Sequence, residues 1–108
     1  MKMTIIRHDD IMSPNYYKNH EWFENHNSGN NYPCCICGKE VKQKNWDKSL
    51  HWFDGGALLT DFGEFPEDLK ARDNRFEDAG DLLCYPVGPD CYRKWLKMKA
   101  TGKYDVEV

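Results

Sequence analysis

The sequence predicts a small α+β domain of treble-clef-like type, stabilised by one zinc ion and built from an N-terminal helix, β-hairpins and a C-terminal helix. Three observations support this fold class. A C-x-x-C-G motif runs from Cys34 to Gly38 and is typical of a zinc knuckle, in which the glycine is expected to have a positive φ. A further cysteine, Cys91, follows a Gly-Pro-Asp turn, where a helix is expected to begin. The chain has 108 residues and a mean hydropathy of -0.86, so its core is small and benefits from a metal.

Length and composition indicate one domain over residues 1–108, with a zinc-stabilised core over 34–108 and an N-terminal extension over 1–33. The cysteine count is five, which is odd, and neither a signal peptide nor an apolar run of about 18 residues is present. We therefore expect a reduced, cytoplasmic protein that does not enter a membrane.

In the N-terminal third, residues 4–7 form a short run of β-prone residues. Ser13 and Pro14 then favour the start of a helix that runs to about residue 26, because proline fits the first turn. This helix is rich in aromatic residues, and we expect it to cover one side of the zinc unit. Residues 27–31 contain Asn, Ser and Gly, and they predict a loop that leads into the knuckle.

After the knuckle, Val41 begins a weak strand, and residues 49–53 and 57–60 predict the two strands of a β-hairpin. The intervening Asp-Gly-Gly sequence supplies its turn. Residues 61–81 have no clear period and carry eight acidic and three basic residues, which indicates an acidic loop.

The C-terminal quarter contains an apolar strand over 81–88 and then a helix with Asp90 at its N-cap. Gly102 is expected just after the helix end, in the left-handed conformation. Between residues 93 and 103 the chain has five basic residues and no acidic one. The tail over 103–108 alternates like an edge strand.

A structural zinc site needs four ligands, and the knuckle supplies Cys34 and Cys37. Cys91 is well placed as the third, because the dipole and free N–H groups of a first helical turn stabilise a thiolate. His51, on the first strand of the predicted hairpin, is the favoured fourth ligand, and Cys84 is the first substitute for it. The predicted zinc ligands are therefore Cys34, Cys37, His51 and Cys91.

The remaining candidates have other expected roles. Cys84 lies on an apolar strand and is expected to be a small buried core residue. Cys35 lies inside the knuckle, and its side chain should point away from a metal that Cys34 and Cys37 hold. His20 and His26 are expected at the surface or as capping residues.

Several strings in the chain resemble a group of small uncharacterised zinc-binding proteins carried by bacteriophages and other mobile elements. The strings are C-x-x-C-G-K-x-V, H-x-x-D-G-G, G-D-L and P-V-G-P-D-C-x-R-K, and they span residues 34–96. The matching positions are Cys34, Cys37, Gly38, His51, Asp54, Gly55, Gly56, Gly80, Asp81, Pro86, Val87, Gly88, Cys91 and Lys94. The resemblance implies a zinc site without an assigned activity, and a protein that acts in the cytoplasm of a bacterial host.

These features favour a non-enzymatic binding module that docks on a host macromolecule, in the first place a protein. By analogy with mobile elements, this partner includes components of a defence system such as CRISPR. The acidic loop over 61–81 is the preferred docking surface, and the basic helix is the second choice. One alternative is a zinc finger that binds nucleic acid through the basic helix, although the net charge of -3 opposes it. The other is a nuclease of the His-Asn-His type, for which the final helix lacks the necessary His and Asn residues.

Overall fold

The computed structural model of the chain describes residues 2–26, 29, 31–53, 57–61 and 81–107. The elements in this part of the chain are β1 (Lys2–Arg7), α1 (His8–Ile11), α2 (Tyr16–His26), β2 (Tyr32–Pro33), β3 (Glu40–Val41), the 3₁₀-helix η1 (Gln43–Asn45), β4 (Ser49–Phe53), β5 (Leu58–Thr60), β6 (Asp81–Pro86), α4 (Pro89–Ala100) and β7 (Asp105–Glu107). They form a small α+β structure with antiparallel sheets, as the sequence predicts. The acidic segment over 62–80 lies outside the described residues.

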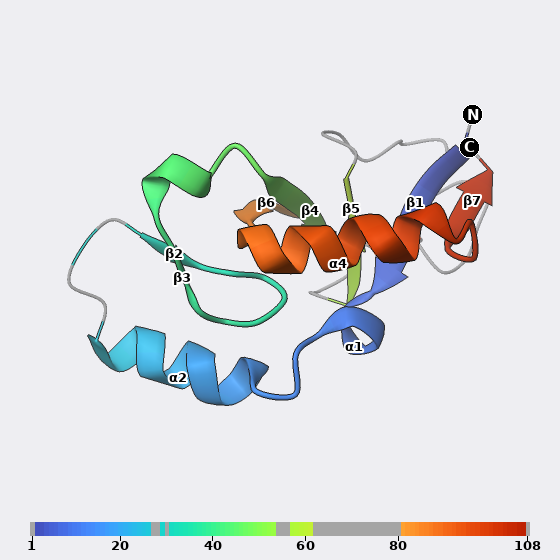
Figure 1. Cartoon of the computed structure of the whole chain (residues 1–108). Coiled ribbons are helices and arrows are strands. Elements are labelled where there is room, and N and C mark those ends of the chain that lie inside the picture. The colour runs from blue at the N-terminus through green and yellow to red at the C-terminus, as the bar shows by residue number, and fades with distance from the viewer. Residues whose placement is uncertain (1, 27–28, 30, 54–56, 62–80, 108) are drawn as a thin grey trace.

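The main sheet has five strands in the order β6-β4-β5-β1-β7, and every pairing in it is antiparallel. The predicted hairpin over 49–60 is confirmed as β4 and β5. The predicted strand before the final helix is β6, and the predicted edge strand at the C-terminus is β7. The knuckle lies on a separate two-stranded ribbon of β2 and β3 (Figure 1).

Strand β1 lies inside the main sheet, between β5 and β7. Its register pairs Ile6 with Leu59 on one side and Met3 with Val106 on the other. The segment that the sequence suggested as an extension therefore supplies a strand whose side chains Met3, Ile5 and Ile6 are all buried. The first residues of the chain and its C-terminal tail pair with each other, so the two ends lie together (Figure 1).

Helix α4 lies across one face of the sheet (Figure 1). Its Trp95 is fully buried and packs in one cluster with Leu50, Leu59 and Ile6 from the strands and with Ile36 from the knuckle. Because successive side chains of a strand point to opposite faces of the sheet, the residues of β4 alternate between two environments. Leu50 and Trp52 lie on the face toward α4, and His51 and Phe53 lie on the other face, where both are buried.

The start of α4 differs from the expectation in one respect. Gly88, with φ of -64° and ψ of 154°, is its N-cap, Pro89 occupies the first position, and no side chain caps the helix. Asp90 is therefore not the N-cap; it is the second residue of the helix and pairs with Arg93. The end of the helix is as predicted, because Gly102 has a φ of +71°.

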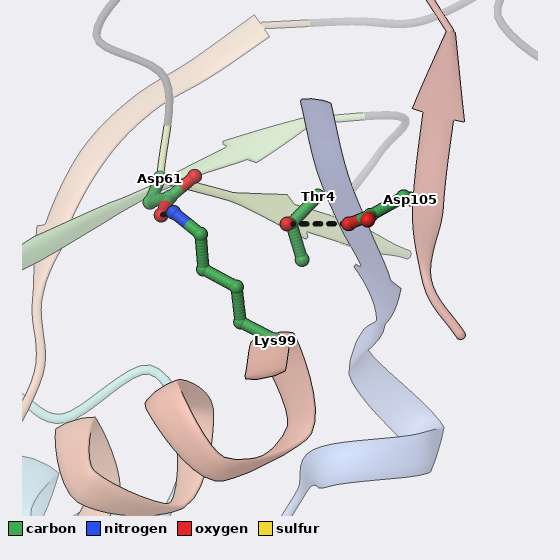
Figure 2. A network of polar contacts seen from close by, with 4 residues as sticks. All are labelled: Thr4, Asp61, Lys99 and Asp105. Carbon is green, nitrogen blue, oxygen red and sulfur yellow. Dashed lines mark hydrogen bonds and ion pairs between the residues drawn. The ribbon is translucent and has the colours of Figure 1, made fainter. Parts of the chain in front are cut away.

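Two polar contacts join parts of the chain that are distant in the sequence, one between β1 and β7 and one between α4 and the residue after β5. Figure 2 shows the hydroxyl of Thr4 on β1 donating to a carboxylate oxygen of Asp105 on β7, at 3.1 Å. It also shows Lys99 on α4 in an ion pair with Asp61, directly after β5.

Among the described residues, no helix is long and apolar enough to span a bilayer.

Candidate metal centre

Two cysteines of one turn and a third that lies more than fifty positions later meet at the start of α4. The turn between β2 and β3 carries Cys34 and Cys37, and the first turn of α4 carries Cys91. Their sulfur atoms all lie within 4.8 Å of one another. Three thiolates on one tetrahedral zinc ion, with bonds of about 2.3 Å, would be separated by about 3.8 Å. The cluster is therefore a candidate site for a metal ion and needs only small side-chain adjustments to hold one.

The knuckle turn is closed by its own backbone. The N–H of Cys34 donates to the carbonyl of Lys39 at 2.7 Å, and the N–H of Gly38 donates to the carbonyl of Cys34 at 2.9 Å. Gly38 has a φ of +79°, which confirms the sequence-based expectation of a left-handed residue here. A Cβ atom at Gly38 would also lie only 2.5 Å from the carbonyl oxygen of Tyr16 on α2. Glycine is therefore needed both for the turn and for the close approach of α2.

The Cys34 sulfur lies in a setting that favours an anion. It accepts hydrogen bonds from the backbone N–H of Ile36 at 3.4 Å and of Gly88 at 3.3 Å. Gly88 is the residue before α4, so one sulfur joins the knuckle to the loop that leads into this helix. The side chain is also buried, with 1% of its surface exposed. Donation of N–H groups to a thiolate offsets part of the cost of burying its charge.

The three thiols affect one another strongly. The pKa of Cys34 is lowered to about 2, chiefly because the thiols of Cys37 and Cys91 donate to its sulfur and the Gly88 N–H adds to this, while burial acts in the opposite direction. The pKa values of Cys37 and Cys91 are raised, first because each thiol donates to Cys34. The group thus holds one negative charge readily and further charges only against repulsion. A divalent cation removes that repulsion and favours three thiolates.

The N-terminal segment supports the knuckle from outside. Three consecutive knuckle carbonyls each accept a hydrogen bond from this segment: Cys35 from Nε2–H of His8 at 2.7 Å, Ile36 from the N–H of Ser13 at 2.9 Å, and Cys37 from the side-chain amide of Asn19 at 2.9 Å. Sequence reasoning did not find these partners, because no local pattern marks a contact between residues 18 to 27 positions apart. The geometry of the cysteine cluster therefore depends on α1 and α2 as well as on the knuckle.

His51, the predicted fourth ligand, does not join this group in the structure. It lies on β4, on the face opposite Leu50, whereas Leu50 packs in the same cluster as Cys34. Its ring is in edge contact with that of Phe53, with a centroid distance of 6.3 Å. The structure thus brings together three of the four predicted ligands, and the assignment of His51 stays a prediction.

The other two cysteines also lie outside the cluster. Cys35 is buried and is not among the three grouped residues, as expected, and burial raises the pKa of its thiol. Cys84 was expected in the core, and this is wrong, because the residue is exposed. The reason is its place on β6, the edge strand of the sheet, opposite His51.

His20 and His26 have local partners on α2, as predicted for residues near the surface. His20 Nδ1 lies 3.2 Å from a carboxylate oxygen of Glu24, and His26 Nδ1 donates to the carbonyl of Trp22 at 2.8 Å.

No family model matches the chain, and no curated protein or solved structure is detectably similar to it. The candidate site therefore rests on the chain's own residues and their geometry.

Proposed function

We propose that the protein is a zinc-stabilised, non-enzymatic binding module with a treble-clef-like zinc unit. The observation that carries the proposal is the convergence of Cys34, Cys37 and Cys91 within 4.8 Å, two from a knuckle and one from a helix start. Zinc is favoured over calcium or magnesium, because those ions prefer oxygen ligands and thiolates suit zinc.

Zinc at this position would act first on stability. It would join the β2–β3 ribbon to α4, which the sequence separates by about fifty residues. In small zinc-binding peptides the metal contributes on the order of 10 kcal/mol, as much as the net stability of many domains. A chain of 108 residues has room for only a small core, so it gains much from such a cross-link.

The partner predicted from the resemblance to mobile-element proteins is a host macromolecule, with components of a defence system such as CRISPR included. The acidic residues over 62–80 are outside the described part of the chain, so the preferred docking surface stays a prediction. Its first acid, Asp61, is described, and it forms an ion pair with Lys99 on α4.

Nucleic-acid binding through α4 is the second candidate, and the structure gives a reason to rank it lower. Arg93 pairs with Asp90, Lys94 donates from Nζ to the carbonyl of Ile11 at 2.7 Å, and Lys99 pairs with Asp61. The two ion pairs offset part of the positive charge that a phosphate backbone would meet, and the contact with Ile11 holds the Lys94 ammonium against the protein. A nuclease of the His-Asn-His type ranks lower still, because α4 carries neither His nor Asn.

Elemental analysis of protein purified without added metal tests the proposal directly, with one zinc per chain as the expected result. Removal of the metal by a chelator should abolish the cooperative unfolding transition, and added zinc should restore it. A metal-free chain that still unfolds cooperatively would contradict the proposal. Tight binding of single-stranded DNA that weakens steeply with salt would favour the second candidate.

A further inference from the structure

We propose that a metal ion held by Cys34, Cys37 and Cys91 keeps its fourth position for a ligand from outside the chain. The ligand that suits this position is a neutral nitrogen donor such as imidazole. The inference rests on the proposed metal binding and goes beyond it, because it concerns what the bound metal can recognise.

The nitrogen and sulfur donors of the chain can all be placed. All five cysteines and all four histidines lie within the described residues. Among these residues, the only group of three or more close metal-ligating side chains is the one with the three cysteines. No described Asp or Glu joins it either. A tetrahedral metal at this cluster thus has one position that these side chains do not fill.

His51 is the best remaining donor, but it lies on the wrong face of the sheet. Leu50 faces the cysteines and α4, and His51 faces the other side of the sheet. To present His51 to the cluster, β4 would have to slip by one residue against β5 and β6. Such a slip would move Leu50 out of the core and reverse Phe53 as well, so the register opposes it strongly. Cys84 pairs with His51 and is on the same, wrong face.

The three cysteines differ in their exposure to solvent. Cys34 is buried, but Cys37 and Cys91 are half-buried, so the cluster lies near the surface, with Cys34 on its inner side. A small molecule from solvent can therefore approach the metal without opening the fold. An isolated three-sulfur cluster sealed inside the core would not allow this.

The charge of the site selects the kind of ligand. Three thiolates on a divalent ion leave a formal charge of about -1, which the N–H groups of Ile36 and Gly88 offset only in part. A neutral donor adds no further charge, whereas an anion would be repelled. The same electron-rich sulfurs weaken the pull of the metal on bound water, compared with zinc on three imidazoles. The open position is thus a binding position and not a centre for hydrolysis.

Cobalt(II) replaces zinc as a probe with visible absorption in the test. The full-length protein is loaded with cobalt and titrated with imidazole. The sulfur-to-cobalt charge-transfer band should keep its intensity, while the visible d–d bands shift and saturate with one imidazole per metal. The His51→Ala variant should respond to imidazole in the same way, and its metal affinity should change by less than about tenfold. A tenfold loss is the smallest that is typical of residues that orient a metal ligand without binding the metal themselves.

The result that would overturn this inference alone differs from the result that would also overturn the proposed function. Cobalt bands that do not respond to imidazole, together with loss of metal affinity in His51→Ala, would show that His51 closes the site and would overturn the inference alone. His51→Gln, which keeps most of the buried volume, distinguishes loss of a ligand from loss of packing, because only a ligand role predicts changed cobalt bands in a folded variant. A folded wild-type chain that binds no cobalt or zinc would overturn the proposed function and the inference together.

Discussion

The side-chain amide of Asn19 donates a hydrogen bond of 2.9 Å to the carbonyl oxygen of Cys37, a residue of the candidate metal centre. This bond connects the middle of α2 to the end of the knuckle turn. Gly38 lies directly against α2 at the same place, so the helix and the turn approach with backbone in contact. The position of Cys37 is therefore set from two sides, by its own turn and by α2.

Replacing Asn19 with Ala should destabilise the zinc-loaded protein by about 1–2 kcal/mol, because the half-buried carbonyl of Cys37 loses its donor. Urea unfolding at neutral pH measures the change. Asn25→Ala is the matched control, since Asn25 is exposed on the same helix, and it should change stability by less than about 0.5 kcal/mol. Equal effects of the two substitutions would mean that the contact with the knuckle contributes nothing.

Local signals in the sequence were sufficient for several elements. The C-x-x-C-G motif predicted the knuckle and the positive φ of Gly38, and the Gly-Pro-Asp sequence predicted the start of α4 to within two residues, with the N-cap at Gly88 instead of Asp90. Both depend on residues within a few positions, where backbone conformation follows from residue type. The identity of the three clustered cysteines followed from metal chemistry added to these local predictions.

Other features depend on how strands align, and the sequence does not specify that alignment. The face on which His51 lies is decided by the pairing of β4 with β5 and β6, and a shift of one residue would reverse it. The exposure of Cys84 follows from the position of β6 at the sheet edge. The place of β1 between β5 and β7 requires pairing across most of the chain, so no local pattern reveals it.

Serine substitutions at the three clustered cysteines should each remove metal. Cys34→Ser, Cys37→Ser and Cys91→Ser each take away a thiolate ligand, so metal content should fall well below one per chain and soluble yield should drop. Cys84→Ser is the matched control, because Cys84 is exposed and outside the cluster. Metal analysis of the purified variants measures the effect, and loss of metal in Cys84→Ser would assign that residue to the site.

Cys35→Ala should retain the metal, although Cys35 is adjacent to Cys34. Its side chain is buried outside the cluster, so the expected cost is a small cavity of about 1 kcal/mol. Alanine is preferable to serine here, because a hydroxyl would be buried among apolar neighbours. Metal content near zero in folded Cys35→Ala would indicate a knuckle that uses adjacent cysteines.

Alanine substitutions at the two glycines with positive φ separate the cost of a strained backbone conformation from the cost of a steric contact. Gly102→Ala should cost about 1–2 kcal/mol, because its φ of +71° is strained for alanine while the nearest atom to a new Cβ is 3.7 Å away. Gly38→Ala carries the same strain and also places Cβ 2.5 Å from the carbonyl oxygen of Tyr16. Its expected cost is about 2–5 kcal/mol. Thermal unfolding with zinc present compares the two variants, and equal shifts would mean that α2 moves away freely.

The last prediction concerns the stability of the protein at alkaline pH. The pKa of Tyr16 is raised from 10.0 to about 12, mainly because burial disfavours the phenolate, and charge on the neighbouring Cys35 adds to this. Below pH 10 the hydroxyl is protonated in both the folded and the unfolded chain, so it has no effect on the pH dependence. Between pH 10 and about 12 the unfolded chain releases this proton and the folded chain retains it.

The free energy of unfolding should therefore fall across this window, and Tyr16→Phe should make the fall less steep. Urea unfolding of both proteins at pH 9, 10, 11 and 12, with zinc present, gives the difference between their slopes. Tyr32→Phe is the control, because it removes the hydroxyl of an exposed tyrosine outside α2, and it should change the slope less than Tyr16→Phe does. Parallel curves for the wild-type chain and Tyr16→Phe would mean that the hydroxyl of Tyr16 ionises as it does in water. In that case α2 would have to open at alkaline pH before the domain unfolds, since the folded position of Tyr16 buries the ring against His8 and the helix.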